Sequence, residues 1–187
     1  MATPGIGPAQ APTQTQGAQS LSQNGRAFIV LREGGFVNHN YNDNAHPPNC
    51  TYGAGTLKHH GPCTPAELAA PNYSQAQMEE PLSQRLAVAE RAVRHNVTVP
   101  LTQSQFDALV SITYNAGPGT RGDPTSGAQP LYRAINSQGP EAAAQTILST
   151  AIHSRHRDPR THRVTRTVNH GVVNRRHFEL QLYRGQL

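Results

Sequence analysis

The sequence contains no tryptophan, and aromatic residues make up only 5% of its 187 positions. Long hydrophobic runs are also missing, since no stretch approaches the ~20 apolar residues that a membrane-spanning helix requires. Met1 is not followed by a basic segment and an apolar run, the pattern of a secretory signal. We therefore expect synthesis in the cytoplasm without a recognisable signal peptide, and no stable insertion into a membrane.

Lysine is almost absent, because Lys58 is the only one, so nearly all of the positive charge comes from arginine. The 16 basic residues outnumber the 11 acidic ones, and the net charge is +5. Many arginines lie late in the chain: Arg155, Arg157, Arg160, Arg163, Arg166, Arg175 and Arg176. Such a segment attracts polyanions, which include nucleic acid, anionic lipid and the acidic polymers of a bacterial envelope. A merely solubilising surface explains the composition equally well.

Charged side chains are absent from the first 19 residues, which are rich in proline, glutamine and glycine. Such a segment cannot bury enough apolar surface to order itself. We predict a flexible tail over residues 1–20 and a single domain over residues 21–187, which is long enough to form a core.

Hydrophobic periodicity and capping signals predict an α+β domain, mostly helical, with a small irregular antiparallel sheet within residues 36–60. Thr51–Thr56 alternates like one short strand, and the basic segment 153–170 is predicted to be loop-like or weakly helical. Helices are expected over about residues 21–33, 81–95, 103–116, 131–136, 140–152 and 171–184, and another begins at Thr64. Ser74 is expected to cap the helix that contains residues 81–95.

Two carboxylates, Glu33 and Asp43, stand in a polar stretch that contains no other acid and no lysine or arginine up to Thr56. Glycoside hydrolysis requires a protonated carboxylic acid at the leaving oxygen and a second group that activates water or attacks. A glutamate at the end of an apolar helix suits the first role, because partial burial favours a protonated carboxyl. The hydroxyl of Thr51 could orient the same water. On spacing alone, two solvated surface acids explain the pattern as well.

The chain resembles the phage-type lysozymes, or muramidases, of glycoside hydrolase family 24. Three blocks in order, within about residues 33–183, carry the resemblance. They are Glu33-Gly34 with Tyr41-Asn42-Asp43 and Thr51-Tyr52-Gly53-Ala54-Gly55, then Gln105–Gly117 with its Asn115-Ala116-Gly117 end, then Val173-Asn174-Arg175-Arg176-His177-Phe178-Glu179.

The resemblance implies a lysozyme-like fold with a small β-hairpin lobe near the N-terminus and a cleft between the lobes. It implies an endo-acting muramidase that cuts the β-1,4 bond between N-acetylmuramic acid and N-acetylglucosamine in peptidoglycan, acting as an endolysin in the periplasm. Glu33 would be the acid, Asp43 and Thr51 would hold the water or stabilise the transition state, and Arg175 would order Glu33. An inverting reaction would place the two carboxyl groups ~6.5–9.5 Å apart. A monomer without cofactor, metal or nucleic-acid partner is expected.

The chain departs from the family pattern in its spacing. A strict count from Glu33 places Asn42 where an aspartate is expected. We assign Asp43 instead, because Tyr41 keeps its place two residues earlier and an asparagine cannot act as a base. Thr56 stands where a histidine commonly follows the last glycine, and the aromatic residue expected near 150–155 is missing.

Two rival functions remain open at this point. One is a catalytically inactive lysozyme-fold module that binds glycan or nucleic acid through its arginine-rich segment. The other is a lytic transglycosylase, which also uses one catalytic glutamate and leaves an anhydro sugar.

Cysteine is scarce, with only Cys50 and Cys63. A disulfide is favoured if the protein works outside the cytoplasm, and it would close a loop of about a dozen residues. Two buried thiols come second. A Cys–His–Cys zinc site with His59 and His60 comes third, because the spacing matches no familiar zinc pattern.

Overall fold

The computed structural model describes residues 19–123, 125–157 and 160–187, with side chains left undescribed at 154–157. Most of the expected tail, residues 1–18, lies outside this part of the chain. Gln19 is already buried, and its side-chain amide donates to the carbonyl oxygen of Leu101 (3.1 Å), while Arg94 donates to the Gln19 carbonyl (2.7 Å). The folded body therefore includes a residue that the sequence had assigned to the tail.

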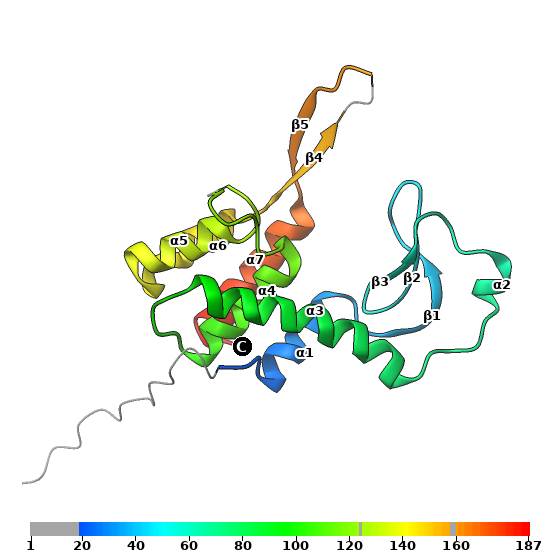
Figure 1. Ribbon diagram of the computed structural model, residues 1–187, viewed down its shortest axis with the longest axis horizontal. Helices are drawn as coiled ribbons and strands as arrows, with labels where there is room; N and C mark the ends of the chain where they lie inside the picture. The colour runs from blue at the N-terminus through cyan, green and yellow to red at the C-terminus, as the bar shows by residue number, and fades with distance from the viewer. Residues whose placement is uncertain (1–18, 124, 158–159) are drawn as a thin grey trace, which may run out of the picture.

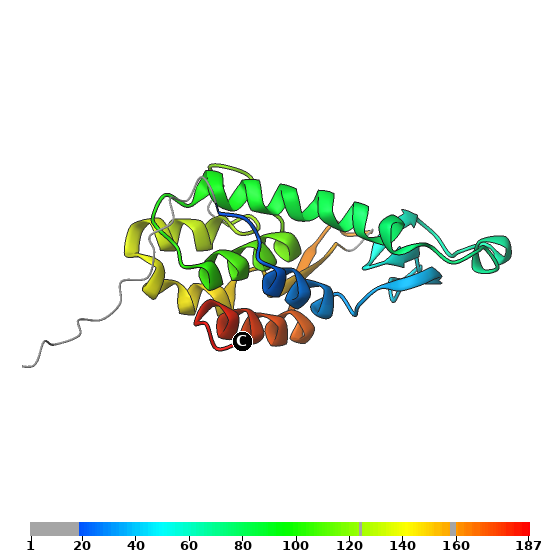
Figure 2. The same cartoon turned by 90° about the horizontal axis from the view of Figure 1, so that it is seen from below.

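The predicted α+β, lysozyme-like architecture is confirmed. Figure 1 shows a helical lobe at one end and a small sheet at the other, with helix α3, Gln75–Asn96, extending between them. Figure 2 shows the same helix along the top of the helical lobe, with one end at the small sheet. Among the described residues, no helix is both long and apolar enough to cross a membrane.

The small sheet has the strand order β1-β2-β3 and is antiparallel throughout. Its strands are β1 Val37–Asn42, β2 Cys50–Gly53 and β3 Thr56–His59. The prediction of one continuous strand over 51–56 was wrong. The chain turns at Ala54-Gly55, where Gly53 (φ 60°) and Gly55 (φ 66°) adopt the left-handed region that favours glycine.

Helix α1, Gln23–Arg32, begins at a Ser22 cap and ends at Glu33. The carboxylate of Asp107 accepts hydrogen bonds from the backbone N–H (3.0 Å) and the hydroxyl of Ser22, which fixes the start of α1 on helix α4. Gly25 permits this close approach, because a Cβ there would lie 2.6 Å from Asp107. Glu33 is thereby held at the end of an anchored helix.

Capping boxes start three helices. Thr64 with Glu67 starts α2, Pro65–Leu68, and Thr102 with Gln105 starts α4, Gln103–Ala116, both as predicted. In α3, Ser74 forms a capping box with Gln77. Helix α3 therefore begins well before residue 81, and Pro81 lies inside it.

Helix α4 is the centre of the core, as its apolar sequence predicted, since every residue from Phe106 to Thr113 is buried. Helix α7, His170–Tyr183, and helix α3 pack against it, and Tyr132 of α5, Gln129–Gln138, forms a hydrogen bond with its Thr113 (2.6 Å). The helix expected over 140–152 is shorter. A 3-10 turn, η2 Pro140–Ala143, leads into α6, Ala144–Ser149, and the backbone is extended at Thr150.

The basic segment forms a second antiparallel sheet of two strands, β4 His153–Arg157 and β5 Val164–Val168. The prediction of a loop or weak helix was therefore wrong. The alternating Val164-Thr165-Arg166-Thr167-Val168 favours a strand because β-branched side chains suit a pleated backbone. Every residue of β5 is exposed, and Figure 1 shows the hairpin projecting from the body above α7.

Candidate active site

A pocket of about 380 Å³ opens beside the end of α1. Its walls come from the end of α1, the middle of α3 and the C-terminal end of α4 with the residues that follow it. The lining residues are Glu33, Arg85, Val88, Ala89, Thr113, Tyr114, Asn115, Gly117 and Pro118. The first carboxylate singled out in the sequence thus lies in the wall of a cavity.

Arg175 of α7 contacts Glu33 across more than a hundred residues of sequence. Its Nη1 donates to Glu33 Oε1 at 2.6 Å, and the two side chains are 10% and 21% exposed. The structure therefore brings Arg175 to the carboxyl that the family resemblance pairs with it.

Arg175 is itself held by Glu179, which is fully buried one helical turn later. Arg175 Nε donates to Glu179 Oε1 (3.0 Å), and Ser111 Oγ donates to the same oxygen (2.6 Å). The other oxygen accepts from Arg176 Nη1 (2.5 Å), and Arg176 also donates to Asn115 Oδ1 (2.8 Å). A buried charge network therefore connects α7 and α4 to Glu33.

Glu179 and Arg176 stand within the third sequence block of the family resemblance, but no catalytic or positioning role was predicted for either. The Arg175–Glu179 spacing of four on one helix is the signal that could have found the first contact. Nothing local pointed to Ser111, because its contact with Glu179 depends on how α4 packs against α7.

Asp43 lies just after β1, in the loop that leads to β2. Its Oδ1 accepts from the backbone N–H groups of Asn49 (2.8 Å) and Ala45 (3.0 Å), and its Oδ2 accepts from Asn49 Nδ2 (3.0 Å). The hydrogen bonds from Asn49, followed by that from Ala45, lower the pKa of Asp43 because they stabilise the ionised form. Asp43 is therefore a carboxylate, not a carboxylic acid, near neutral pH.

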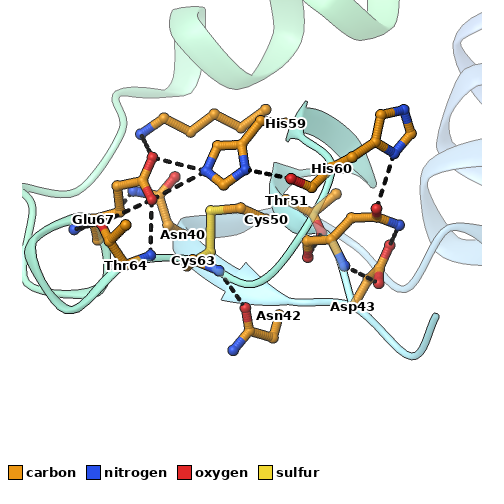
Figure 3. The surroundings of a disulfide bond; sticks show 12 residues. Asn40, Asn42, Asp43, Cys50, Thr51, His59, His60, Cys63, Thr64 and Glu67 are labelled. Atoms are coloured by element: carbon orange, nitrogen blue, oxygen red, sulfur yellow. Dashed lines mark hydrogen bonds and ion pairs between the residues drawn. A yellow bond between two sulfur atoms is a disulfide. The ribbon is translucent and has the colours of Figure 1, made fainter. Parts of the chain in front are cut away.

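Asn42 points elsewhere. Its Oδ1 accepts from the backbone N–H of Cys63 at 2.7 Å, and Figure 3 shows its side chain directed away from Asp43. Successive residues of a strand face opposite sides, so Asn42 lies on the face of the sheet opposite to Tyr41. The amide is thus engaged in holding the loop at Cys63.

Thr51 and Tyr41 are cross-strand partners in the β1–β2 pair. Burial raises the pKa of Tyr41, and the negative charges of Asp43 and, to a smaller extent, Glu33 raise it further; a hydrogen bond with Thr51 opposes them. The phenol of Tyr41 therefore lies within electrostatic range of both carboxylates. From the sequence, Tyr41 was predicted only to fix the register of Asp43. Thr51 is buried beside it.

Arg85 of α3 ties the turn of the small sheet to the helical lobe. Its Nη2 donates to the Ala54 carbonyl (3.1 Å) and to Thr56 Oγ1 (3.2 Å), and its guanidinium lies 5.4 Å from the ring centre of Tyr114. Arg85 and Tyr114 both line the pocket that holds Glu33. The turn after β2 is thereby fixed beside that pocket.

Cys50 and Cys63 form a disulfide, with Cα atoms 4.6 Å apart (Figure 3). Ligand atoms of Cys50, His59 and Glu67 lie within 4.8 Å of one another, but the disulfide leaves no thiolate at Cys50 for a metal. His59 Nε2 instead bonds to Glu67 (3.0 Å). The hydrogen bond from the Thr64 backbone N–H, followed by those from His59 and from the Thr64 hydroxyl, lowers the pKa of Glu67 to about 2.

Loss of this disulfide should destabilise the protein by about 3 kcal/mol, because the bond closes a short loop in the unfolded chain. We expect the change in the free energy of unfolding to appear in urea titrations of Cys50→Ser. The double variant Cys50→Ser/Cys63→Ser is the matched control, since it has no disulfide and reductant should leave its free energy of unfolding unchanged. If reductant destabilised that variant as much as the wild type, the loss would not come from the disulfide.

The comparisons with known proteins agree with this geometry. Residues 32–179 match the family model described as Phage lysozyme. The chain belongs to the phage lysozyme family. This match spans both lobes and includes Glu33, Asp43, Thr51, Arg175 and Glu179. A search of curated proteins found no match.

Solved structures give the same result. The endolysin from Escherichia coli O157:H7 phage FAHEc1 is 25% identical at a TM-score of 0.70, over 92% of this chain and 98% of that chain. A P22 lysozyme mutant is 25% identical at a TM-score of 0.58, over 89% and 99%. The muramidase domain of SpmX from Asticaccaulis excentricus, at 22% identity and a TM-score of 0.63 over 88% and 97%, shares the fold.

Family membership makes this protein a glycoside hydrolase that degrades peptidoglycan, the polymer of the bacterial cell wall. The resemblance of the sequence to the phage-type lysozymes of glycoside hydrolase family 24 is thereby confirmed.

Proposed function

We propose that the enzyme is an endo-acting muramidase that hydrolyses the β-1,4 bond between N-acetylmuramic acid and N-acetylglucosamine. The observation that carries the proposal is Glu33 in the wall of the pocket, with its carboxyl oriented by the largely buried Arg175. Glu33 is the general acid. Asp43 and Thr51 hold and activate the attacking water.

The two oxygens of Glu33 have different surroundings. Arg175 donates to Oε1, and a guanidinium can only donate hydrogen bonds, so Oε2 is the oxygen that can carry the proton when Glu33 acts as the acid. Oε2 is directed toward Gly55, where a Cβ would lie 3.9 Å from it. The glycine keeps the approach to the proton clear of a side chain. The glycosidic oxygen accepts this proton as the bond to the sugar breaks.

Asp43 activates the attacking water. Its lowered pKa keeps it ionised, and a carboxylate can accept a proton from a water molecule on the opposite side of the sugar. Thr51 lies one strand away, and its hydroxyl donates to the Asn49 carbonyl at 3.3 Å. Asn42 is engaged with Cys63, which supports Asp43 as the second catalytic position.

A single digestion tests this assignment. Purified enzyme added to purified peptidoglycan should clear the suspension and release muropeptides with new reducing ends, identified by mass analysis. Products ending in anhydro sugars would instead identify a lytic transglycosylase. Binding without any product would identify the inactive glycan-binding module.

We further propose that the enzyme acts as a monomer in the periplasm, after release or delivery from the cytoplasm, and has no nucleic-acid partner.

The basic hairpin supports retention on an anionic wall. Arg163 and Arg166 are exposed in the hairpin. A cation near an anionic surface contributes ~1 kcal/mol, so we expect Arg163→Gln/Arg166→Gln, which removes two cations, to weaken binding to intact walls by roughly 30-fold at low salt. Co-sedimentation with walls measures this. Arg91→Gln, which removes an arginine from the surface of α3, should bind like the wild type. Equal loss in both variants would rule out a specific role of the hairpin.

A further inference from the structure

The loop between β1 and β2 is closed by reciprocal contacts between Asp43 and Asn49. The backbone N–H of Asp43 donates to the Asn49 carbonyl (3.0 Å), and the backbone N–H of Asn49 donates to Asp43 Oδ1 (2.8 Å). The Asn49 side chain then reaches the other oxygen, because Nδ2 donates to Oδ2 at 3.0 Å. Asn49 therefore contacts both oxygens of the carboxylate and fixes its rotation.

His60 fixes the amide of Asn49 in turn. Its Nδ1 lies 3.0 Å from Asn49 Oδ1, and Figure 3 shows the ring of His60 directed at the side chain that leads on to Asp43. An amide oxygen only accepts, so Nδ1 carries the proton in this contact. With its oxygen turned to His60, Asn49 presents its NH₂ group to Asp43. Hydrogen bonds thus run in one direction, from His60 through Asn49 to the carboxylate.

The two segments that supply these residues are joined covalently. Asn49 directly precedes Cys50, and His60 lies three residues before Cys63, so the disulfide links the end of the loop to the segment that follows β3. Cys63 N–H also donates to Asn42, the residue before Asp43. These connections hold Asn49, which is half-buried, and His60, which is exposed, within hydrogen-bonding distance of each other.

We propose that Asn49 and His60 are positioning residues for Asp43: His60 sets the orientation of the Asn49 amide, which holds Asp43 so that one acceptor position of Oδ2 is directed at the attacking water. A carboxylate offers about four acceptor positions, and the described donors occupy two on Oδ1 and one on Oδ2. The inference rests on the proposed catalytic role of Asp43. Neither residue belongs to the three sequence blocks that carry the family resemblance.

The variant Asn49→Ala tests the proposal on soluble peptidoglycan fragments of defined length. We expect kcat to fall by about tenfold while KM stays near the wild-type value, because a misplaced catalytic group slows the reaction without removing sugar contacts. Asn44→Ala, in the same loop, is the matched control and should leave kcat unchanged. Equal kcat values for Asn49→Ala and Asn44→Ala would overturn the positioning role.

Variants of His60 test the direction of the relay. His60→Leu should lower kcat, whereas His60→Asn should restore most of it, because the amide nitrogen of asparagine can occupy the place of Nδ1. The double variant Asn49→Ala/His60→Leu should be no slower than Asn49→Ala, since His60 acts through Asn49. Additive losses in the double variant would contradict the relay.

Asp43→Asn separates this proposal from the one it rests on. If Asp43→Asn is inactive and Asn49→Ala is fully active, the positioning role fails and the function of Asp43 stands. If Asp43→Asn retains full activity, the assignment of Asp43 itself fails.

Discussion

Replacement of Glu33 by glutamine should reduce the release of reducing ends from peptidoglycan by roughly 10³-fold, within the range that a general acid contributes. Glutamine keeps a carbonyl oxygen that can accept from Arg175 but has no acidic proton to give to the glycosidic oxygen. The measurement is the initial rate of product formation on purified walls, with the thermal midpoint of the variant recorded alongside.

Glu80→Gln is the control for this substitution. Glu80 lies on the surface of α3 and accepts a hydrogen bond from Gln84 of the same helix. It should retain wild-type activity, which would show that loss of any one surface carboxylate is not sufficient. Full activity of Glu33→Gln in a correctly folded protein would refute Glu33 as the acid and leave the proposed mechanism without its first step.

Replacement of Glu179 by alanine should destabilise the protein by about 3–5 kcal/mol, because it leaves buried positive charge without its counter-charge. Glu179 and Arg176 are both 0% exposed, and Arg175 is 10% exposed. Removal of the carboxylate also deprives Ser111 of its acceptor. The free energy of unfolding from urea titration measures the effect.

Gln181→Ala, an exposed position on the same helix, serves as the control and should change the stability by less than about 0.5 kcal/mol. Glu179→Gln keeps the size of the side chain and an acceptor for Ser111, so an intermediate loss is expected even if the alanine variant does not fold. A stability of Glu179→Gln equal to that of the wild type would show that the charge of Glu179 is unimportant to the network. Activity should fall with stability, because Arg175 loses one of its two anchors.

Local signals in the sequence were sufficient for much of the fold. The capping boxes at Thr64 and Thr102 started helices where expected, because they satisfy backbone groups within four residues. The apolar run around Leu109 predicted a buried helix, because its hydrophobic side chains lie close together in the sequence. The errors arose where pairing across the chain decides the structure. The arginine-rich composition of β4 and β5 led to the prediction of a loop or weak helix instead of a hairpin. The turn at Gly55 divides residues 51–56, which alternate like one strand, between β2 and β3.

The sequence by itself determined the family, the position of Glu33 at a helix end and the candidates Asp43 and Thr51. Only the tertiary structure decided what surrounds them, because the partners come from distant segments. Arg175 reaches Glu33 from the last helix, Glu179 meets Ser111 where α7 packs on α4, and His60 reaches Asn49 beside a disulfide. Charges and hydrogen bonds act over a few ångströms of space regardless of sequence separation, so their partners follow from packing and not from spacing along the chain.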